Sequence, residues 1–153
     1  ITNYRVYYKK QGEFENSVYE GVFNMLARLK EAGKRLIVAT SKPEEMALRI
    51  TEHFGLAEYF EYIAGATMDE SRNTKPAVIR YALETCGIGK SPEDLSRVVM
   101  IGDRLHDVEG AHEIGIDCIG VLYGYGSQEE LEKAGADYIA GTPDEAADII
   151  IRL

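Results

Sequence analysis

The chain has 153 residues, of which 45% are hydrophobic and 28% are charged, enough apolar sequence for one core of ordinary size. Its net charge is −9, and no long run of lysine and arginine is interleaved with aromatic residues, which argues against nucleic acids and anionic membranes as partners. The apolar stretches are too short to span a membrane and no signal segment opens the chain, so we expect a cytoplasmic protein. Cys86 and Cys118 fit neither a metal motif nor a disulfide framework, and we expect both to be buried.

Predicted strands and helices alternate along the chain with short links, which is typical of a parallel sheet built from βαβ units. Only the first eighteen residues stand apart; they are rich in Tyr and Lys, and residues 2–10 have a helical pattern. The predicted strands are 35–40, 61–65, 97–101, 117–122 and 136–140. The predicted helices are 19–32, one that opens at 41–43 with proline in its first turn, 75–86, 105–114, 128–133 and one from 143 onward. We therefore expect an α/β fold, a Rossmann-like parallel sheet with helices on both faces.

Two carboxylates follow the predicted strand at 97–101. The strand stops at Gly102, and Asp103 and Asp107 come next, four residues apart. Asp103 is expected at the carboxyl end of the strand, where open α/β sheets bind ligands, and Asp107 in the first turn of the following helix. Carboxylate oxygens without nearby Cys or His pairs favour Mg²⁺ over zinc. A helix-capping aspartate with a second acid nearby is the structural alternative.

Two further strand ends carry polar residues at the same predicted edge of the sheet. Thr40 and Ser41 end the first predicted strand of the core, and Lys75 starts a helix after the second. A hydroxyl, backbone amides at a helix start, an ammonium and a carboxylate pair together are the parts of a phosphate site. Singly, Thr40 or Ser41 could cap the helix at Pro43, and Lys75 could be a solvated lysine. We expect Thr40, Lys75, Asp103 and Asp107 to converge on one pocket.

The order Val-Ala-Thr-Ser-Lys-Pro, then Lys75, then Gly-Asp-x-x-x-Asp resembles the haloacid dehalogenase superfamily of phosphohydrolases over nearly the whole chain. The second motif of that superfamily is a strand ending in Thr or Ser, which matches Thr40. The third is a lysine at a helix start, which matches Lys75, and the fourth is the acidic pair, which matches Asp103 and Asp107.

Shorter segments resemble particular branches of the superfamily. Phe54-Gly55-Leu56 and Gly124-Tyr125-Gly126-Ser127 are similar to the phosphoglycolate phosphatases, and Asp69-Glu70-Ser71-Arg72 is similar to bacterial 5′-nucleotidase-like members. The resemblance implies a Mg²⁺-dependent phosphatase that hydrolyses a small phosphorylated metabolite through an aspartyl-phosphate. It implies that Asp103 ligates Mg²⁺ and that Asp107 ligates through water or orients the loop. Thr40, Ser41 and Lys75 would bind the phosphoryl group, and Lys75 and Thr40 would act in catalysis.

The superfamily's first motif, Asp-x-Asp-x-Thr, is absent, and no Asp-x-Asp occurs in the chain. That motif supplies the nucleophile and the general acid/base at the end of a central strand. We therefore expect the C-terminal portion of a longer phosphatase, with the end of a helical cap at 1–18 and an incomplete core at 19–153. The missing strand should leave a slot between the strands that end at Thr40 and Ile101. This chain alone is then expected to be inactive.

Two non-enzymatic interpretations stay open. A phosphate-binding or Mg²⁺-binding domain resembling response-regulator receivers also uses carboxylates, a hydroxyl and a lysine at strand ends, but the acidic pair precedes the lysine there, whereas here it follows. The second of these interpretations is a catalytically inactive relative that is used for protein interaction. His53, His106 and His112 all fall in helical patterns, where surface positions are expected rather than catalytic ones.

Overall fold

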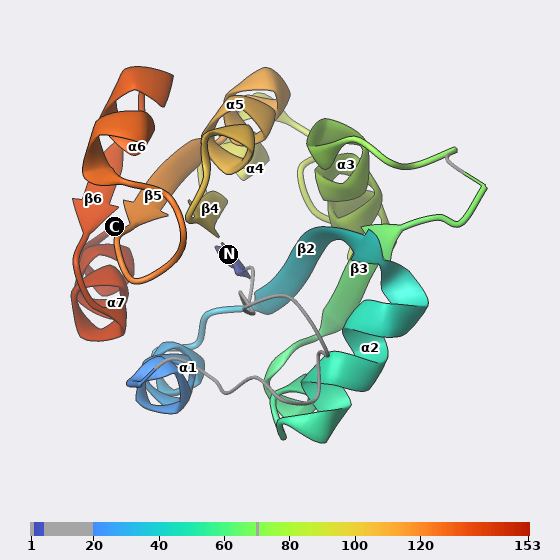
Figure 1. Cartoon of the computed structure of the whole chain (residues 1–153), viewed down its shortest axis with the longest axis horizontal. Coiled ribbons are helices and arrows are strands. Elements are labelled where there is room, and N and C mark those ends of the chain that lie inside the picture. The colour runs from blue at the N-terminus through green and yellow to red at the C-terminus, as the bar shows by residue number, and fades with distance from the viewer. Residues whose placement is uncertain (1, 5–19, 70) are drawn as a thin grey trace.

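A six-stranded parallel sheet organises the protein in the computed structural model, which describes residues 2–4, 20–69 and 71–153. The strand order is β3-β2-β1-β4-β5-β6 (Figure 1). The strands are β1 (Thr2–Tyr4), β2 (Leu36–Pro43), β3 (Tyr62–Ala66), β4 (Val99–Gly102), β5 (Asp117–Val121) and β6 (Tyr138–Ala140). The helices are α1 (Val22–Glu31), α2 (Glu44–His53), η2 (Ala57–Tyr59), α3 (Lys75–Thr85), α4 (Pro92–Leu95), α5 (Leu105–Ile114), α6 (Gln128–Ala134) and α7 (Pro143–Arg152). The predicted α/β class is confirmed.

Helices cover both faces of this sheet, which explains the nearly continuous apolar runs of its strands. In β4, Val99 and Ile101 pack with the buried residues of α1, α2 and α7, while Met100 packs with those of α3, α5 and α6. Cys118 is fully buried in the second of these layers, as predicted, but Cys86 is only half-buried. Among the residues described, no helix is both long enough and apolar enough to cross a membrane.

The predicted boundary between β2 and α2 is wrong. We expected Pro43 in the first turn of the helix, but β2 runs on to Pro43, which pairs with Ala66 of β3 after an irregularity in the register. Pro43 is extended, with φ −54° and ψ 139°, and forms the N-cap of α2. The pairing with β3 therefore extends the strand beyond Thr40, where the apolar run had suggested its end.

The centre of the sheet also differs from expectation. The strands that end near Thr40 and Ile101 do not pair with each other, as predicted, but the slot between them is occupied by β1. Thr2 pairs with Leu36 of β2 and with Val99 of β4, so β1 lies between the two strands in parallel register. Two facing strand edges leave backbone groups that need partners, and three N-terminal residues satisfy them.

This pairing corrects part of the prediction for the N-terminal segment. Residues 2–4 form a strand and not the start of the expected helix, because the sheet offers hydrogen-bonding partners on both sides. The remainder of that helix, residues 5–10, lies outside the described residues, as do residues 11–18 of the expected cap region. The division of the chain at residue 18 therefore stays a prediction.

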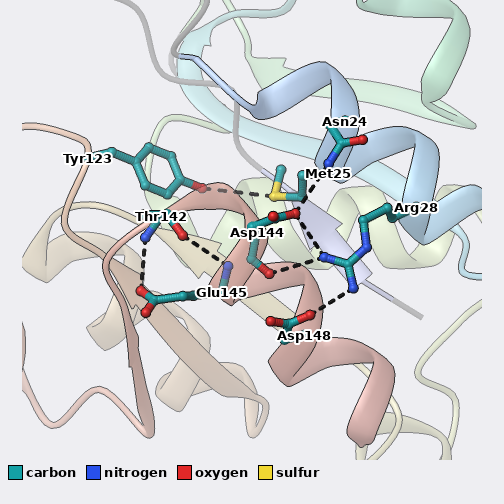
Figure 2. A network of polar contacts seen from close by, with 8 residues as sticks. All are labelled: Asn24, Met25, Arg28, Tyr123, Thr142, Asp144, Glu145 and Asp148. Carbon is teal, nitrogen blue, oxygen red and sulfur yellow. Dashed lines mark hydrogen bonds and ion pairs between the residues drawn. The ribbon is translucent and has the colours of Figure 1, made fainter.

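A polar network fixes α1 against α7 on the same face of the sheet (Figure 2). The Arg28 guanidinium of α1 donates to Asp144 at 2.9 Å and to Asp148 at 2.7 Å, two carboxylates one turn apart on α7. Asn24, one turn before Arg28, also donates to Asp144. At the start of α7, Thr142 and Glu145 form a reciprocal capping box, so the helix that receives Arg28 is itself well terminated.

The central position of β1 predicts a large effect of proline at Asn3. Because proline removes a backbone donor from a strand that is paired on both sides, Asn3→Pro should lower the free energy of unfolding by about 3 kcal/mol. Asn3→Ala is the control for loss of the side chain and should change it by less than about 1 kcal/mol. Urea denaturation of the three proteins measures the difference, and equal stability of the proline and alanine variants would contradict the assignment of β1.

Candidate active site at the carboxyl edge of the sheet

Four buried polar side chains gather between the second half of β2 and the end of β4. Thr40, Lys75, Asp103 and Asp107 are each at most 5% exposed, and in the described part of the chain the only other buried polar side chain is Thr51 of α2. Lysine and aspartate are almost never fully buried unless they are paired. The burial of Lys75 therefore excludes the alternative of a solvated lysine.

Lys75 forms an ion pair with Asp107 in the interior. The Lys75 Nζ lies 2.8 Å from Asp107 Oδ1 and 3.5 Å from the carbonyl oxygen of Ala39, the residue before Thr40. The pair thus joins the first turns of α3 and α5 to the middle of β2. Gly110 of α5 makes the approach possible, since a Cβ there would lie 2.6 Å from Lys75 Cγ.

The second oxygen of Asp107 holds the loop that contains Asp103. Asp107 Oδ2 accepts hydrogen bonds from the backbone amides of Asp103 at 3.0 Å and Arg104 at 3.1 Å. With Oδ1 on Lys75, both oxygens of Asp107 are bound by protein groups. These contacts favour the loop-orienting role for Asp107 over the water-mediated metal contact.

Asp103 is held by a glycine-rich loop after β5. Its Oδ2 accepts a hydrogen bond of 3.0 Å from the Tyr125 amide. A Cβ at Gly124 would lie 2.4 Å from Asp103 Cβ, and one at Gly126 would lie 2.0 Å from the Asp103 carbonyl oxygen. The sequence analysis singled out Gly124–Ser127 only for its resemblance to the phosphoglycolate phosphatases. Its position after a strand that ends at the same edge of the sheet is the signal that could have indicated its contact with Asp103.

A second support of the loop that contains Asp103 was missed by the sequence analysis. Glu130 of α6 accepts from the Arg104 side chain at 2.8 Å and from the Leu105 amide at 2.9 Å, at the start of α5. The hydrogen bond from Arg104, with that from the Leu105 amide, lowers the pKa of Glu130 below its ordinary value. No periodicity or motif points to a contact across 25 residues, so the sequence carried no signal for it.

Thr40 and Ser41 follow one another in the second half of β2. The Thr40 hydroxyl accepts from the Lys42 amide at 3.2 Å, and no side chain caps α2, so neither residue is the helix cap that was the alternative. Ser41 is exposed. The structure therefore connects Lys75, Asp107 and Asp103 by direct contacts and places Thr40 next to the carbonyl that Lys75 approaches.

The three histidines lie in helices and are exposed, as expected for surface positions. His112 contacts Asp137 at 2.8 Å, away from the buried site. The described residues contain no cluster of three or more His, Cys, Asp or Glu side chains arranged for a metal. Asp103 offers a hard oxygen donor that fits Mg²⁺, an ion that usually keeps several waters and takes only one or two carboxylates.

The close packing of glycine against the acidic pair makes a testable prediction. A Cβ on Gly102 would lie 2.1 Å from Asp107 Cβ, which is anchored and cannot move away. Gly102→Ala should therefore lower the free energy of unfolding by about 1–3 kcal/mol or more, the usual cost of overpacking. The control is Gly141→Ala, where a Cβ would first meet the carboxylate of the exposed Glu145, which can move into solvent at the expense of its capping contacts alone. Urea denaturation should show a much smaller change for the control, and equal effects would contradict the packing.

Comparison with known proteins shows the family to which this chain is related. A family model described as haloacid dehalogenase-like hydrolase matches residues 1–121. A solved structure described as a predicted phosphatase from Clostridium acetobutylicum is 47% identical, covers 95% of this chain with 65% of its own length, and superposes with a TM-score of 0.87.

Three relatives carry different functional names. Tyrosine-protein kinase PtkA of Mycobacterium tuberculosis is 43% identical over 152 residues, 98% of this chain and 50% of the relative. A 5′-nucleotidase of Pseudomonas aeruginosa is 39% identical and covers 86% of the chain and 57% of the relative. A phosphoglycolate phosphatase of Neisseria meningitidis is 32% identical, with 95% and 61% covered. The chain thus spans little more than half the length of these relatives. It belongs to the haloacid dehalogenase-like hydrolase family.

Proposed function

We propose that this chain supplies the phosphate-binding and Mg²⁺-binding part of a phosphomonoester hydrolase, acting on a small phosphorylated metabolite. The observation that carries the proposal is the buried chain of contacts from Lys75 through Asp107 to the loop of Asp103. It concentrates one cation and a cation-binding carboxylate at the edge of the sheet where ligands bind in such folds. The family to which the chain belongs supports hydrolysis as the reaction class.

In this proposal each residue has a defined task. The Lys75 ammonium offsets negative charge as the phosphoryl group is transferred, and the Thr40 hydroxyl and the Ser41 amide hold phosphoryl oxygens. Asp103 would hold Mg²⁺, which neutralises phosphate charge when bound. Asp107 keeps Lys75 and the Asp103 loop in place through the contacts of its two oxygens.

The covalent step needs a carboxylate that these residues do not provide. We infer that an aspartate outside the 153 residues attacks phosphorus, the bond to the leaving alcohol oxygen breaks as that oxygen gains a proton, and water then hydrolyses the aspartyl-phosphate. The support is that β1 contains no acid and that the first acidic residue of the sequence is Glu13. The proposal assigns the reaction to the cytoplasm, where two thiols outside any disulfide, Cys86 and Cys118, are normal.

The hydrolase relatives leave the substrate within one chemical class, that of small phosphomonoesters. Phosphoglycolate and a nucleoside monophosphate are the two candidates drawn from the names of the hydrolase relatives. The relative named as a tyrosine kinase adds transfer of a phosphoryl group to a tyrosine hydroxyl as a third reaction to assay. All three reactions transfer a phosphoryl group, so in this proposal the same phosphate-binding residues serve each of them and the choice lies with groups that contact the remainder of the substrate.

Asp103→Asn tests the assigned metal carboxylate in the natural gene product that contains this chain. The asparagine oxygen can still accept from the Tyr125 amide, so the loop should stay folded while the charge is lost. We expect kcat for p-nitrophenyl phosphate in Mg²⁺ to fall by at least about 100-fold. Asp137→Asn is the matched control, because Asp137 also accepts a backbone amide, that of Cys118, at another edge of the sheet. Similar losses in both variants would contradict the assignment.

The 153-residue chain by itself should not turn over p-nitrophenyl phosphate, since Lys75 and Mg²⁺ stabilise charge but form no bond to phosphorus. Steady-state assays of this chain beside the natural gene product make the comparison. Full activity of the 153-residue chain would show that the nucleophile lies within it. Phosphate binding with no turnover by either protein would favour the non-enzymatic binding domain.

A further inference from the structure

The loop between β3 and α3, residues 67–74, ends at the residue before Lys75. Little of its described surface is buried. Every described side chain in it is exposed or half-buried, and Met68 is 79% exposed. Apolar packing therefore does not fix the conformation of this loop. Polar contacts do, and most of them involve Arg72.

Arg72 joins the loop to three elements of the core. Its Nε donates to the Gly65 carbonyl oxygen at 2.9 Å, and its terminal nitrogen donates to Glu44 at 3.2 Å. Its guanidinium lies over the ring of Tyr81, 3.6 Å from the ring centroid. The Arg72 amide also donates to the Thr67 hydroxyl, which closes the loop on itself. Arg72 thus contacts the end of β3, the start of α2 and the exposed side of α3 at once.

Glu44 completes the network from the other side. Its Oε1 accepts from the Gly65 amide at 3.1 Å as well as from Arg72, and its Oε2 accepts from the Tyr62 hydroxyl at 3.0 Å. The Tyr62 hydroxyl lies 2.9 Å from the Tyr81 hydroxyl. Burial, together with these hydrogen bonds, raises the pKa of Tyr62 above its ordinary value, so its hydroxyl remains a donor to Glu44.

Two functional segments are joined by this network. Glu44 follows Thr40 and Ser41 by a few residues, and Arg72 precedes Lys75 by three. Gly65 holds the two sides close, since a Cβ there would lie 2.6 Å from both the Lys42 carbonyl oxygen and the Glu44 Cα. A planar guanidinium that hydrogen-bonds in two directions and stacks on a ring cannot be replaced by the point charge of lysine.

We propose that Arg72, acting with Glu44, is a positioning residue that sets Lys75 relative to Thr40 and Ser41 of β2. The catalytic part of this inference rests on the proposed function. Arg72 does not touch the reacting atoms; its contacts hold the loop whose last residue caps the Lys75 helix. Thr74 is that cap, and its hydroxyl accepts from the Ala77 amide. Loss of the guanidinium should loosen the loop while the buried ion pair of Lys75 and Asp107 persists.

The experiment uses Arg72→Lys in the natural gene product, with Arg97→Lys as the matched control. Arg97 is exposed, lies two residues beyond the end of α4, and its side chain contacts Glu93 of that short helix. Amide hydrogen exchange followed by mass spectrometry should show exchange across residues 67–78 rising about five-fold or more in the Arg72 variant. Exchange across residues 105–114 should stay unchanged, which separates a local effect from general destabilisation. Unchanged exchange in 67–78 overturns the proposal.

Kinetics give the second readout. Arg72→Lys should lower kcat for p-nitrophenyl phosphate by about ten-fold while KM changes by less than about three-fold, because a less exact placement of Thr40 and Ser41 relative to the ion-paired Lys75 weakens transition-state stabilisation most. Glu44→Gln should act in the same direction, and the double variant should lose less than the product of the two single losses. Normal kcat in an active Arg72 variant overturns the proposal. If the unmodified protein hydrolyses no phosphomonoester, the proposed function fails and hydrogen exchange alone decides the role of Arg72.

Discussion

The buried ion pair between Lys75 and Asp107 is the interaction on which the candidate site depends. Removing two opposite charges from water costs several kcal/mol for each ion, and their mutual attraction offsets this cost only when the geometry is good and the remaining hydrogen-bonding groups are satisfied. Here the separation is 2.8 Å, and the second carboxylate oxygen accepts two backbone amides. The pair therefore fixes two helix starts and the Asp103 loop together.

Close backbone approach is the condition that makes this arrangement possible. Gly102 and Gly110 admit the side chains of Asp107 and Lys75, and Gly124 admits that of Asp103. Any side chain at these three positions would overlap the buried polar groups. Glycine at the end of β4, in α5 and in the loop after β5 thus lets these polar side chains pack closely against the backbone. This close packing explains why they are so well shielded from water.

Much of this could be predicted from the sequence because the signals are local. The apolar run before Gly102 and the acidic pair after it located β4, Asp103 and Asp107, and the alternation of elements gave the parallel sheet. The central place of β1 could not be predicted, since it results from the two edges of β2 and β4 and not from the propensities of residues 2–4. The contacts of Glu130 and of the Tyr125 amide depend on how separate elements meet, so no local pattern contains them.

The central claim is that Lys75 and Asp107 stabilise each other as a buried pair, and a double-mutant cycle tests it most directly. Lys75→Met and Asp107→Asn each leave one buried charge without its partner, whereas the double variant leaves neither charge in the interior. Free energies of unfolding from urea denaturation should show each single variant destabilised by about 3–5 kcal/mol. The double variant should be more stable than the sum of the single losses predicts, by at least about 2 kcal/mol. Strict additivity would contradict the account.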